Sequence, residues 1–119
     1  MIRQLNIANY ETYVILGNDP VEKLEKRNVN VHISLRFSQN NIACRTDNIE
    51  NTICYAALVN FLDDKLRNAE FNLIEKMAQF LYDEISAYLN NASILKHVQV
   101  TKVAPVKNLG SASFVCADW

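Results

Sequence analysis

Residues 28–37 alternate between apolar and polar side chains without a break. The apolar positions are Val29, Val31, Ile33, Leu35 and Phe37, and the polar positions are Asn28, Asn30, His32, Ser34 and Arg36. Successive side chains of a strand point to opposite faces, so this period predicts a strand with one buried face and one polar face. The polar face is too hydrophilic for a second dry core, and we expect it to face water or the polar interior of an assembly.

Three other segments carry the same period and are predicted strands, namely residues 5–17, 94–103 and 111–119. Turn-forming residues separate the strands in pairs. The loop 17–27 begins Gly-Asn-Asp-Pro, and Gly110 lies between the last two strands. The sequence therefore predicts one hairpin near each end of the chain.

Lys102 interrupts the buried face of the third predicted strand. It shares the parity of Val98 and Val100, so its ammonium group is predicted to lie on the face that buries apolar side chains. A buried ammonium group without a partner is costly, and it usually loses its proton or takes a counter-charge. The sequence therefore predicts that Lys102 has a counter-charge or another polar partner in the folded protein.

Two segments between the hairpins change to the period of a helix. The apolar stripe consists of Leu58, Leu62, Leu66 and Ala69 in residues 55–69, and of Leu73, Met77 and Leu81 in residues 72–89. Asn72 followed by Glu75 is a capping-box pattern, which predicts Asn72 as the N-cap of the second helix. The order strand, strand, helix, helix, strand, strand predicts an α+β fold in which two helices cover one face of a four-stranded antiparallel sheet.

Composition narrows the range of partners and compartments. The chain has 119 residues, enough for the one domain (1–119) that we expect, and its net charge of −1 gives no electrostatic reason to expect binding to nucleic acid or to an anionic membrane. No apolar run is long enough to span a bilayer, and the first residues lack the apolar core of a signal peptide. Cys44, Cys54 and Cys116 are odd in number and form no CxxC pair, which favours reduced thiols in the cytoplasm.

Metal, phosphate-loop and serine-nucleophile chemistry find little support. His32 and His97 lie on different predicted strands, no His/Cys/Asp spacing matches a ligand set, and we predict neither a metal nor another cofactor. There is no glycine-rich phosphate loop and no nucleophile elbow.

Four residues are candidates for acid–base chemistry on a small polar heterocycle, namely Glu22, Tyr55, Glu75 and Lys102. Each also has a structural interpretation. Glu22 could be one surface charge among several, and Tyr55 could be a core ring with its hydroxyl group at the rim. Glu75 could only cap its helix, and Lys102 could extend past a strand end into water.

Four stretches of the chain form a recognisable set: Gly17 and Glu22 in the first loop, DNIENTICYAALV at 47–59, EFNLIEKMAQFL at 70–81 and VTKVAP at 100–105. With these motifs the sequence resembles the dihydroneopterin aldolases over about residues 2–114. It implies the T-fold, a ββααββ unit that assembles into a barrel of several subunits, commonly two stacked tetramer rings. The polar strand face would then line the barrel.

The resemblance implies how a pterin substrate is held. Glu75 matches the residue that anchors the pterin, where its carboxylate would accept hydrogen bonds from the 2-amino group and the adjacent ring N–H. Backbone groups around Leu73 and Ile74 would hold other ring edges, together with those around Ile53 of a neighbouring subunit. The sites would therefore lie between subunits of a homo-oligomer, a tetramer or octamer.

The catalytic residues implied by the resemblance are Lys102, Tyr55 from a neighbouring subunit, and Glu22 near the trihydroxypropyl side chain of the substrate. Lys102 would end the buried strand face where the strand opens into a pocket, with substrate, water and carboxylates as its partners. The implied reaction is the retro-aldol cleavage of 7,8-dihydroneopterin into glycolaldehyde and 6-hydroxymethyl-7,8-dihydropterin in folate biosynthesis. It needs neither a metal nor a lysine Schiff base, because the pterin imine accepts the electrons.

The sequence departs from the usual aldolase pattern at three places. Val103 follows the lysine where most aldolases have proline, Arg27 replaces a common glutamine, and Asp47-Asn48 replaces paired acids. The sister enzyme dihydroneopterin triphosphate 2′-epimerase shares the first departure and is the alternative function. A pterin-binding T-fold protein without activity is a further alternative. The zinc-dependent T-fold enzymes are disfavoured, because two histidines cannot supply their three-histidine site.

Overall fold

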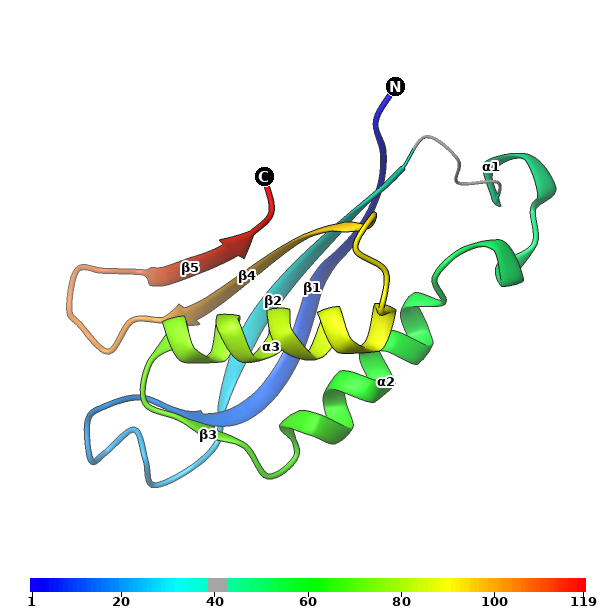
Figure 1. The fold of residues 1–119 in the computed structure, drawn as a ribbon. Coiled ribbons are helices and arrows are strands. Elements are labelled where there is room, and N and C mark those ends of the chain that lie inside the picture. The colour runs from blue at the N-terminus through cyan, green and yellow to red at the C-terminus, as the bar shows by residue number, and fades with distance from the viewer. Residues whose placement is uncertain (39–42) are drawn as a thin grey trace.

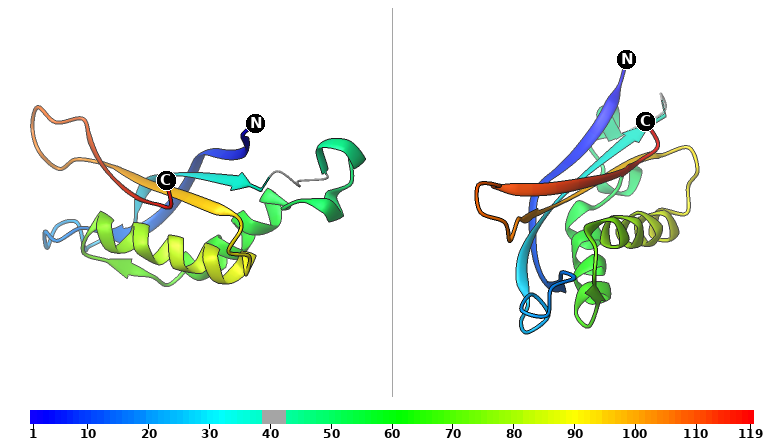
Figure 2. Two further views of the ribbon diagram at one scale, coloured as in Figure 1. Left: turned by 45° about the horizontal axis from the view of Figure 1, so that its top comes forward. Right: turned by 90° about the vertical axis from the view of Figure 1, so that its left-hand side faces the viewer.

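Two helices pack against one face of a twisted sheet in the computed structural model, which describes residues 1–38 and 43–119 (Figure 1). The long strands are β1 (Arg3–Leu16), β2 (Arg27–Phe37), β4 (Leu95–Val103) and β5 (Ser111–Ala117), and the long helices are α2 (Tyr55–Leu66) and α3 (Ile74–Leu89). The second view of Figure 2 shows the two layers, with the helices on one side of the sheet. The predicted α+β fold is confirmed.

Three short elements were not predicted: α1 (Ala43–Thr46), the 3-10 helix η1 (Ile49–Asn51) and β3 (Glu70–Phe71). The strand order is β3-β1-β2-β4-β5, and both predicted hairpins, β1–β2 and β4–β5, are present and antiparallel. The four-stranded antiparallel sheet was nevertheless an incomplete prediction, because β3 pairs in parallel with the end of β1 and makes a mixed sheet of five strands. A strand of two residues is too short to show a period in the sequence.

A bulge in β1 shifts the buried side chains from one parity to the other. Ile7 is buried before it and Tyr10, Thr12 and Val14 after it, and the register with β2 shifts between Ile7 and Tyr10. Asn9 has a φ of 55° here, a left-handed conformation that asparagine tolerates better than most residues. The bulge thereby directs the Tyr10 hydroxyl to Asp63 of α2, to which it donates a hydrogen bond.

The core lies between the sheet and the helices, as the predicted parities and stripes require, except that Leu73 of the second predicted stripe lies before the helix and is 51% exposed. The fully buried side chains of β2 are Val29, Val31, Ile33 and Leu35, and those of the helices include Leu58, Leu62 and Leu66 of α2 and Met77, Leu81 and Ile85 of α3. Each such side chain stabilises the fold by about 1.5–3 kcal/mol relative to exposure.

The opposite face of the sheet is polar, as predicted, but it does not lie wholly in water. Ser34 is buried there, where it donates a hydrogen bond of 2.7 Å to the Asn6 side chain and lies 3.0 Å from His32 Nε2. Asn28, in contrast, is exposed. Neighbouring polar side chains thus shield the centre of this face.

The predicted capping box at the start of α3 is wrong. The helix begins at Ile74, so its N-cap is Leu73, which has extended backbone and makes no side-chain cap. The Asn72 side chain instead accepts a hydrogen bond from the Lys23 ammonium group of the β1–β2 loop. Asn72, the predicted N-cap, therefore binds Lys23 and does not cap the helix. Glu75 lies in the first turn of the helix and takes no part in a capping box.

Candidate functional site

Lys102 has a partner that lies 80 positions away in the sequence. Its Nζ is 2.9 Å from Oε2 of Glu22, and the two side chains are only 18% and 9% exposed. Glu22 reaches this position from the β1–β2 loop, so the loop covers the end of the buried face of β4. The hydrogen bond from Lys102 holds the pKa of the Glu22 carboxyl below its usual range. The pair is therefore a carboxylate and an ammonium group, both largely withdrawn from water.

Gly17 makes room for Glu22. It has a φ of +154°, and a Cβ placed on it would lie 2.5 Å from Glu22 Oε1, closer than non-bonded atoms approach. Its N–H donates a hydrogen bond of 3.1 Å to the Phe71 carbonyl of β3, which fixes the start of the loop. The Asp19 N–H approaches Glu22 Oε1 at 3.4 Å. Only glycine gives both this backbone conformation and this space.

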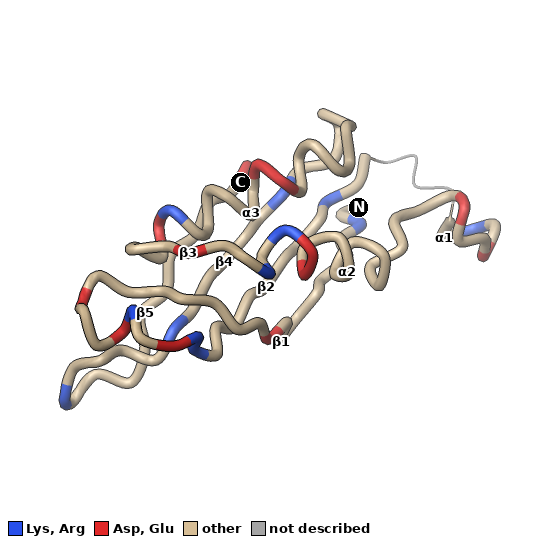
Figure 3. Tube along the Cα trace, turned by 90° about the horizontal axis from the view of Figure 1, so that it is seen from below, with Lys and Arg blue, Asp and Glu red and all other residues tan. Residues whose placement is uncertain are grey.

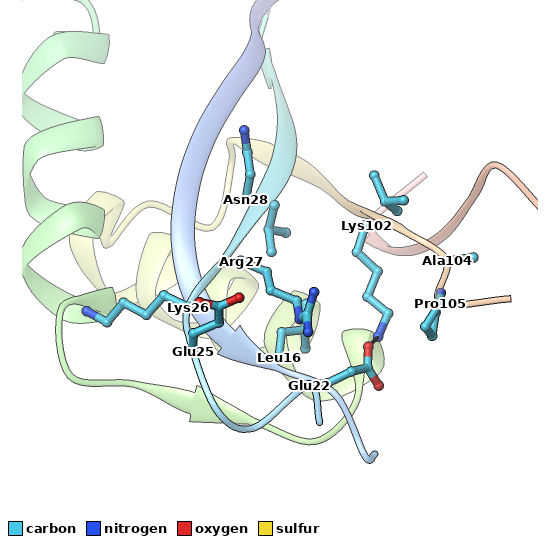
Figure 4. A pocket seen from close by; sticks show the side chains of 11 residues that line it. Leu16, Glu22, Glu25, Lys26, Arg27, Asn28, Lys102, Ala104 and Pro105 are labelled. Carbon is cyan, nitrogen blue, oxygen red and sulfur yellow. Dashed lines mark hydrogen bonds and ion pairs between the residues drawn. The ribbon is translucent and has the colours of Figure 1, made fainter. Parts of the chain in front are cut away.

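Glu22 and Lys102 border a pocket of about 370 Å³ (Figure 4). Its lining comes from β1, the β1–β2 loop, the start of β2 and the end of β4, and consists of Leu16, Glu22, Glu25, Lys26, Arg27, Asn28, Val29, Lys102, Val103, Ala104 and Pro105. Of these residues, the sequence singled out Glu22 and Lys102, and Arg27 and Val103 only as departures from a pattern.

The same loop also contributes Lys23 to a second pocket of about 410 Å³. It is lined by Ile15, Lys23, Glu70, Phe71, Asn72, Leu73 and Lys76. Two successive residues of the loop thus line different pockets. Glu22 binds Lys102 in the first pocket, and Lys23 binds Asn72 in the second. The second pocket contains Leu73, next to the first turn of α3 that carries Ile74 and Glu75. The Glu75 carboxylate is exposed and forms no ion pair or hydrogen bond with any described residue.

Tyr55 is not brought to this site within one chain. It begins α2, is 59% exposed and follows Ile53 by two residues. Figure 1 shows that α2 begins beside the last turn of α3, whereas the first turn of α3 and the end of β4 lie together at the other end of that helix. The structure therefore joins Glu22 with Lys102 and brings the first turn of α3, which carries Ile74 and Glu75, beside the end of β4. It leaves Ile53 and Tyr55 apart from them.

The distribution of charge, the possible metal ligands, the length of the helices and the state of the cysteines add four findings. Acidic and basic residues are interspersed along the chain rather than gathered by sign (Figure 3). Within residues 1–38 and 43–119, no group of three His, Cys, Asp or Glu side chains is arranged to hold a metal ion, and no helix is long and apolar enough to cross a membrane. Cys44, Cys54 and Cys116 are free thiols.

A family model described as FolB, dihydroneopterin aldolase, matches residues 5–117. The chain belongs to the dihydroneopterin aldolase family. A "probable dihydroneopterin aldolase" of Chlamydia trachomatis is 30% identical over 105 residues, which are 88% of this chain and 85% of that protein. Its counterpart in Chlamydia muridarum is 29% identical over 102 residues, 86% of this chain and 84% of the relative. The family predicted from the residue motifs, and with it the prediction of an aldolase, is confirmed.

Solved structures of aldolases share the fold. The Escherichia coli dihydroneopterin aldolase in complex with neopterin superposes with a TM-score of 0.85 at 15% identity, covering 98% of this chain and 99% of the other. A Burkholderia dihydroneopterin aldolase bound to guanine gives a TM-score of 0.72 at 16% identity, covering 98% and 89%. At these identities the likeness shows the fold, and the T-fold prediction for the single chain agrees with it.

Proposed function

We propose that the chain, as one domain, cleaves the side chain of 7,8-dihydroneopterin between C1′ and C2′, with the Glu22–Lys102 pair as the centre of its proton chemistry. The observation that carries this proposal is a carboxylate and an ammonium group 2.9 Å apart at the wall of a pocket. General acid–base catalysis needs such groups within hydrogen-bond reach of the reacting atoms. Family membership supports the substrate, and 6-hydroxymethyl-7,8-dihydropterin and glycolaldehyde are then the products, in folate biosynthesis.

The proposed reaction requires only proton transfers from the protein. The 2′-hydroxyl group loses its proton, the C1′–C2′ bond breaks, and its electron pair moves into the N5=C6 imine of the ring. C2′ leaves as the aldehyde carbon, and C1′ then takes up a proton. Glu22, kept ionised by Lys102, accepts hydrogen bonds from the hydroxyl groups of the substrate side chain, and Lys102 donates protons or relays them through water.

The ring is proposed to lie by the first turn of α3, with Glu75 as its anchor. The exposed Glu75 carboxylate has no described partner of its own, so it is free to accept two N–H groups of a pterin. Backbone groups of Leu73 and Ile74 are next to it.

Tyr55 and Ile53 are proposed to reach the site from a second copy of the chain, in a tetramer or octamer. Two observations support this. Tyr55 is exposed at the start of α2, which lies at the other end of α3 from the end of β4, and β5 ends the sheet as an open edge strand. Pairing such edges between identical subunits covers them by symmetry. We further propose that this assembly works in the cytoplasm, where its free thiols stay reduced.

A direct assay tests the proposed activity. Purified protein is incubated with 7,8-dihydroneopterin, and the products are separated by chromatography. We expect 6-hydroxymethyl-7,8-dihydropterin and glycolaldehyde, and Lys102→Ala should lower kcat by about a hundredfold or more. Lys107→Ala, which removes an exposed lysine of the β4–β5 turn, is the matched control and should change kcat little. A protein that converts no dihydroneopterin would refute the proposal.

Epimerisation at C2′ is the alternative activity, and Val103 after Lys102 is the observation that favours it. Both reactions begin with the same bond cleavage, and they differ in whether the aldehyde departs or adds back. The same chromatogram separates them, because an epimerase yields the 2′-epimer and no glycolaldehyde. A mixture of both products would mean that the aldehyde partitions between departure and re-addition.

The shared site has its own test. Lys102→Ala and Tyr55→Phe are prepared separately, mixed, and allowed to exchange subunits. Sites that draw Lys102 from one variant and Tyr55 from the other are wild type at both positions, so part of the activity should return. Confirmed subunit exchange without recovery would place both residues in the pocket of one chain.

A further inference from the structure

Arg27 lines the pocket beside Glu22 and Lys102 without a partner of its own. It is the first residue of β2, and its guanidinium group forms no ion pair or hydrogen bond with residues 1–38 or 43–119. The other cations of the pocket are engaged. Lys102 donates to Glu22, and Lys26 turns away to donate a hydrogen bond of 2.9 Å to the Arg67 carbonyl oxygen (Figure 4).

Arg27 and Lys102 lie on the same face of the sheet. Val29 is the cross-strand partner of Lys102, and Arg27 precedes Val29 by two positions, so Arg27 and Lys102 are diagonal neighbours across β2 and β4. Diagonal neighbours have their Cβ atoms about 7–8 Å apart or somewhat less. Figure 4 shows both side chains extending toward the loop that carries Glu22. Two cations therefore converge on a region where one carboxylate is already paired.

Of the two cations that stay at the pocket, Lys102 is paired with Glu22 at 2.9 Å, whereas Arg27 forms no ion pair within residues 1–38 and 43–119. The positive charge of Arg27 also contributes, as a minor cause, to the lowered pKa of Glu22. An anionic group in the pocket would supply the counter-charge that Arg27 lacks.

We propose that Arg27 makes this site selective for a dihydroneopterin whose side chain carries a phosphate ester on its terminal hydroxyl group, an inference that rests on the proposed function. The planar guanidinium group binds phosphate through two parallel N–H donors. The ester oxygen is on C3′, one carbon beyond C2′, whose hydroxyl group loses its proton near Glu22 and Lys102 in the proposed reaction. A phosphate there falls within reach of an arginine rooted about 7–8 Å from Lys102.

The reaction stays balanced with the ester. The 2′-hydroxyl group gives its proton to the relay formed by the Glu22–Lys102 pair and water, the C1′–C2′ bond breaks, the electron pair enters the N5=C6 imine, and the relay returns one proton to C1′. The phosphate–oxygen bond is untouched and leaves with the two-carbon fragment. The pterin product is therefore unchanged, and the second product is glycolaldehyde phosphate in place of glycolaldehyde.

The test compares kcat/KM for 7,8-dihydroneopterin, its 3′-monophosphate and its 3′-triphosphate. We expect the wild type to favour one of the esters by about tenfold, a modest ratio because Arg27 is exposed. Arg27→Gln should remove this preference and leave the neutral substrate within about twofold, and Arg27→Lys should keep part of it, since it keeps the charge but loses the paired donors. Lys65→Gln removes one positive charge from the exposed surface of α2 and should leave the preference intact. Added salt should lower the preference in the wild type.

A wild type that prefers the neutral substrate, or an Arg27→Gln variant that slows all three substrates equally, would overturn the inference while leaving the aldolase proposal standing. If no substrate is converted, the proposed function fails, and calorimetry with neopterin and its 3′-phosphates still decides on Arg27. Tighter binding of a phosphate that Arg27→Gln abolishes supports the inference, and equal affinities overturn it. The monophosphate and triphosphate arms identify which ester the site takes.

Discussion

The Glu22–Lys102 pair makes a prediction that can be worked out from its geometry. Three variants are needed: Glu22→Gln, Lys102→Met and the double substitution. Lys102→Met leaves a carboxylate whose side chain is 9% exposed, and within residues 1–38 and 43–119 the only other hydrogen-bond donor to it is the Asp19 N–H at 3.4 Å. Losing a hydrogen bond to a charged group costs about 1.5–3 kcal/mol, and stranding a buried charge adds to that cost. We expect Lys102→Met to lower the free energy of unfolding by about 2–3 kcal/mol.

The double variant should be no less stable than Lys102→Met alone, because glutamine at position 22 removes the stranded charge. Glu22→Gln alone loses the hydrogen bond between two charged groups, which costs about 1.5–3 kcal/mol, so the coupling energy of the cycle is about the same size. The measurement is urea unfolding at pH 7, at one protein concentration because subunit association shifts apparent stability. A coupling energy below about 0.5 kcal/mol, the value of an exposed pair, would refute the argument that the pair is held away from water.

The same pair predicts a pH dependence. The folded-state pKa of Glu22 lies below its ordinary value of 4.5, so its contribution to stability is present above that pH and is lost as the pH falls through the folded-state pKa. The stability difference between wild type and Glu22→Gln should therefore be constant near neutral pH and shrink below about pH 4.5. A difference that grows as the pH falls would contradict the sign.

Three further predictions follow from other contacts. Gly17→Ala should displace the Glu22 side chain, because the new Cβ would lie 2.5 Å from Glu22 Oε1. We expect a lower kcat/KM for dihydroneopterin and a loss of about 1–3 kcal/mol in the free energy of unfolding, measured in urea. Retained activity would show that the loop adapts. Tyr10→Phe removes the hydrogen bond to Asp63 and should lower the free energy of unfolding by about 1 kcal/mol without changing KM. Glu75→Gln should leave the melting temperature nearly unchanged, because no capping box exists to be lost, and should weaken pterin binding by about 2–4 kcal/mol in calorimetry. Unchanged pterin affinity would remove Glu75 from the site.

Several features could be predicted from the sequence because they depend on local periods. The parity of β2 and the stripes of α2 and α3 report which side chains are buried, and burial is what drives these segments together. The four candidate residues also came from the sequence. Lys102 was conspicuous because an ammonium group followed two buried valines, and a partner was required wherever the chain placed it.

Only the tertiary structure decided the contacts between segments that lie far apart in the chain. No pattern identifies Glu22 rather than Glu25 as the partner of Lys102, because the choice depends on a loop whose path is set by Gly17 and its hydrogen bond to Phe71. The bulge at Asn9 follows from fitting β1 to β2, and β3 exists only because β1 offers it an edge.

The start of α3 shows the same limit. In a capping box the side-chain oxygen of the N-cap residue accepts a hydrogen bond from a backbone N–H of the helix, and any other nearby donor competes for that oxygen. Here the Lys23 ammonium group of the β1–β2 loop donates to the side-chain oxygen of Asn72. The separation of Tyr55 from Lys102 likewise depends on the direction in which α2 crosses the sheet. Local periods record which side chains leave water, whereas the positions of charges relative to one another depend on where the folded chain brings its loops and helix ends.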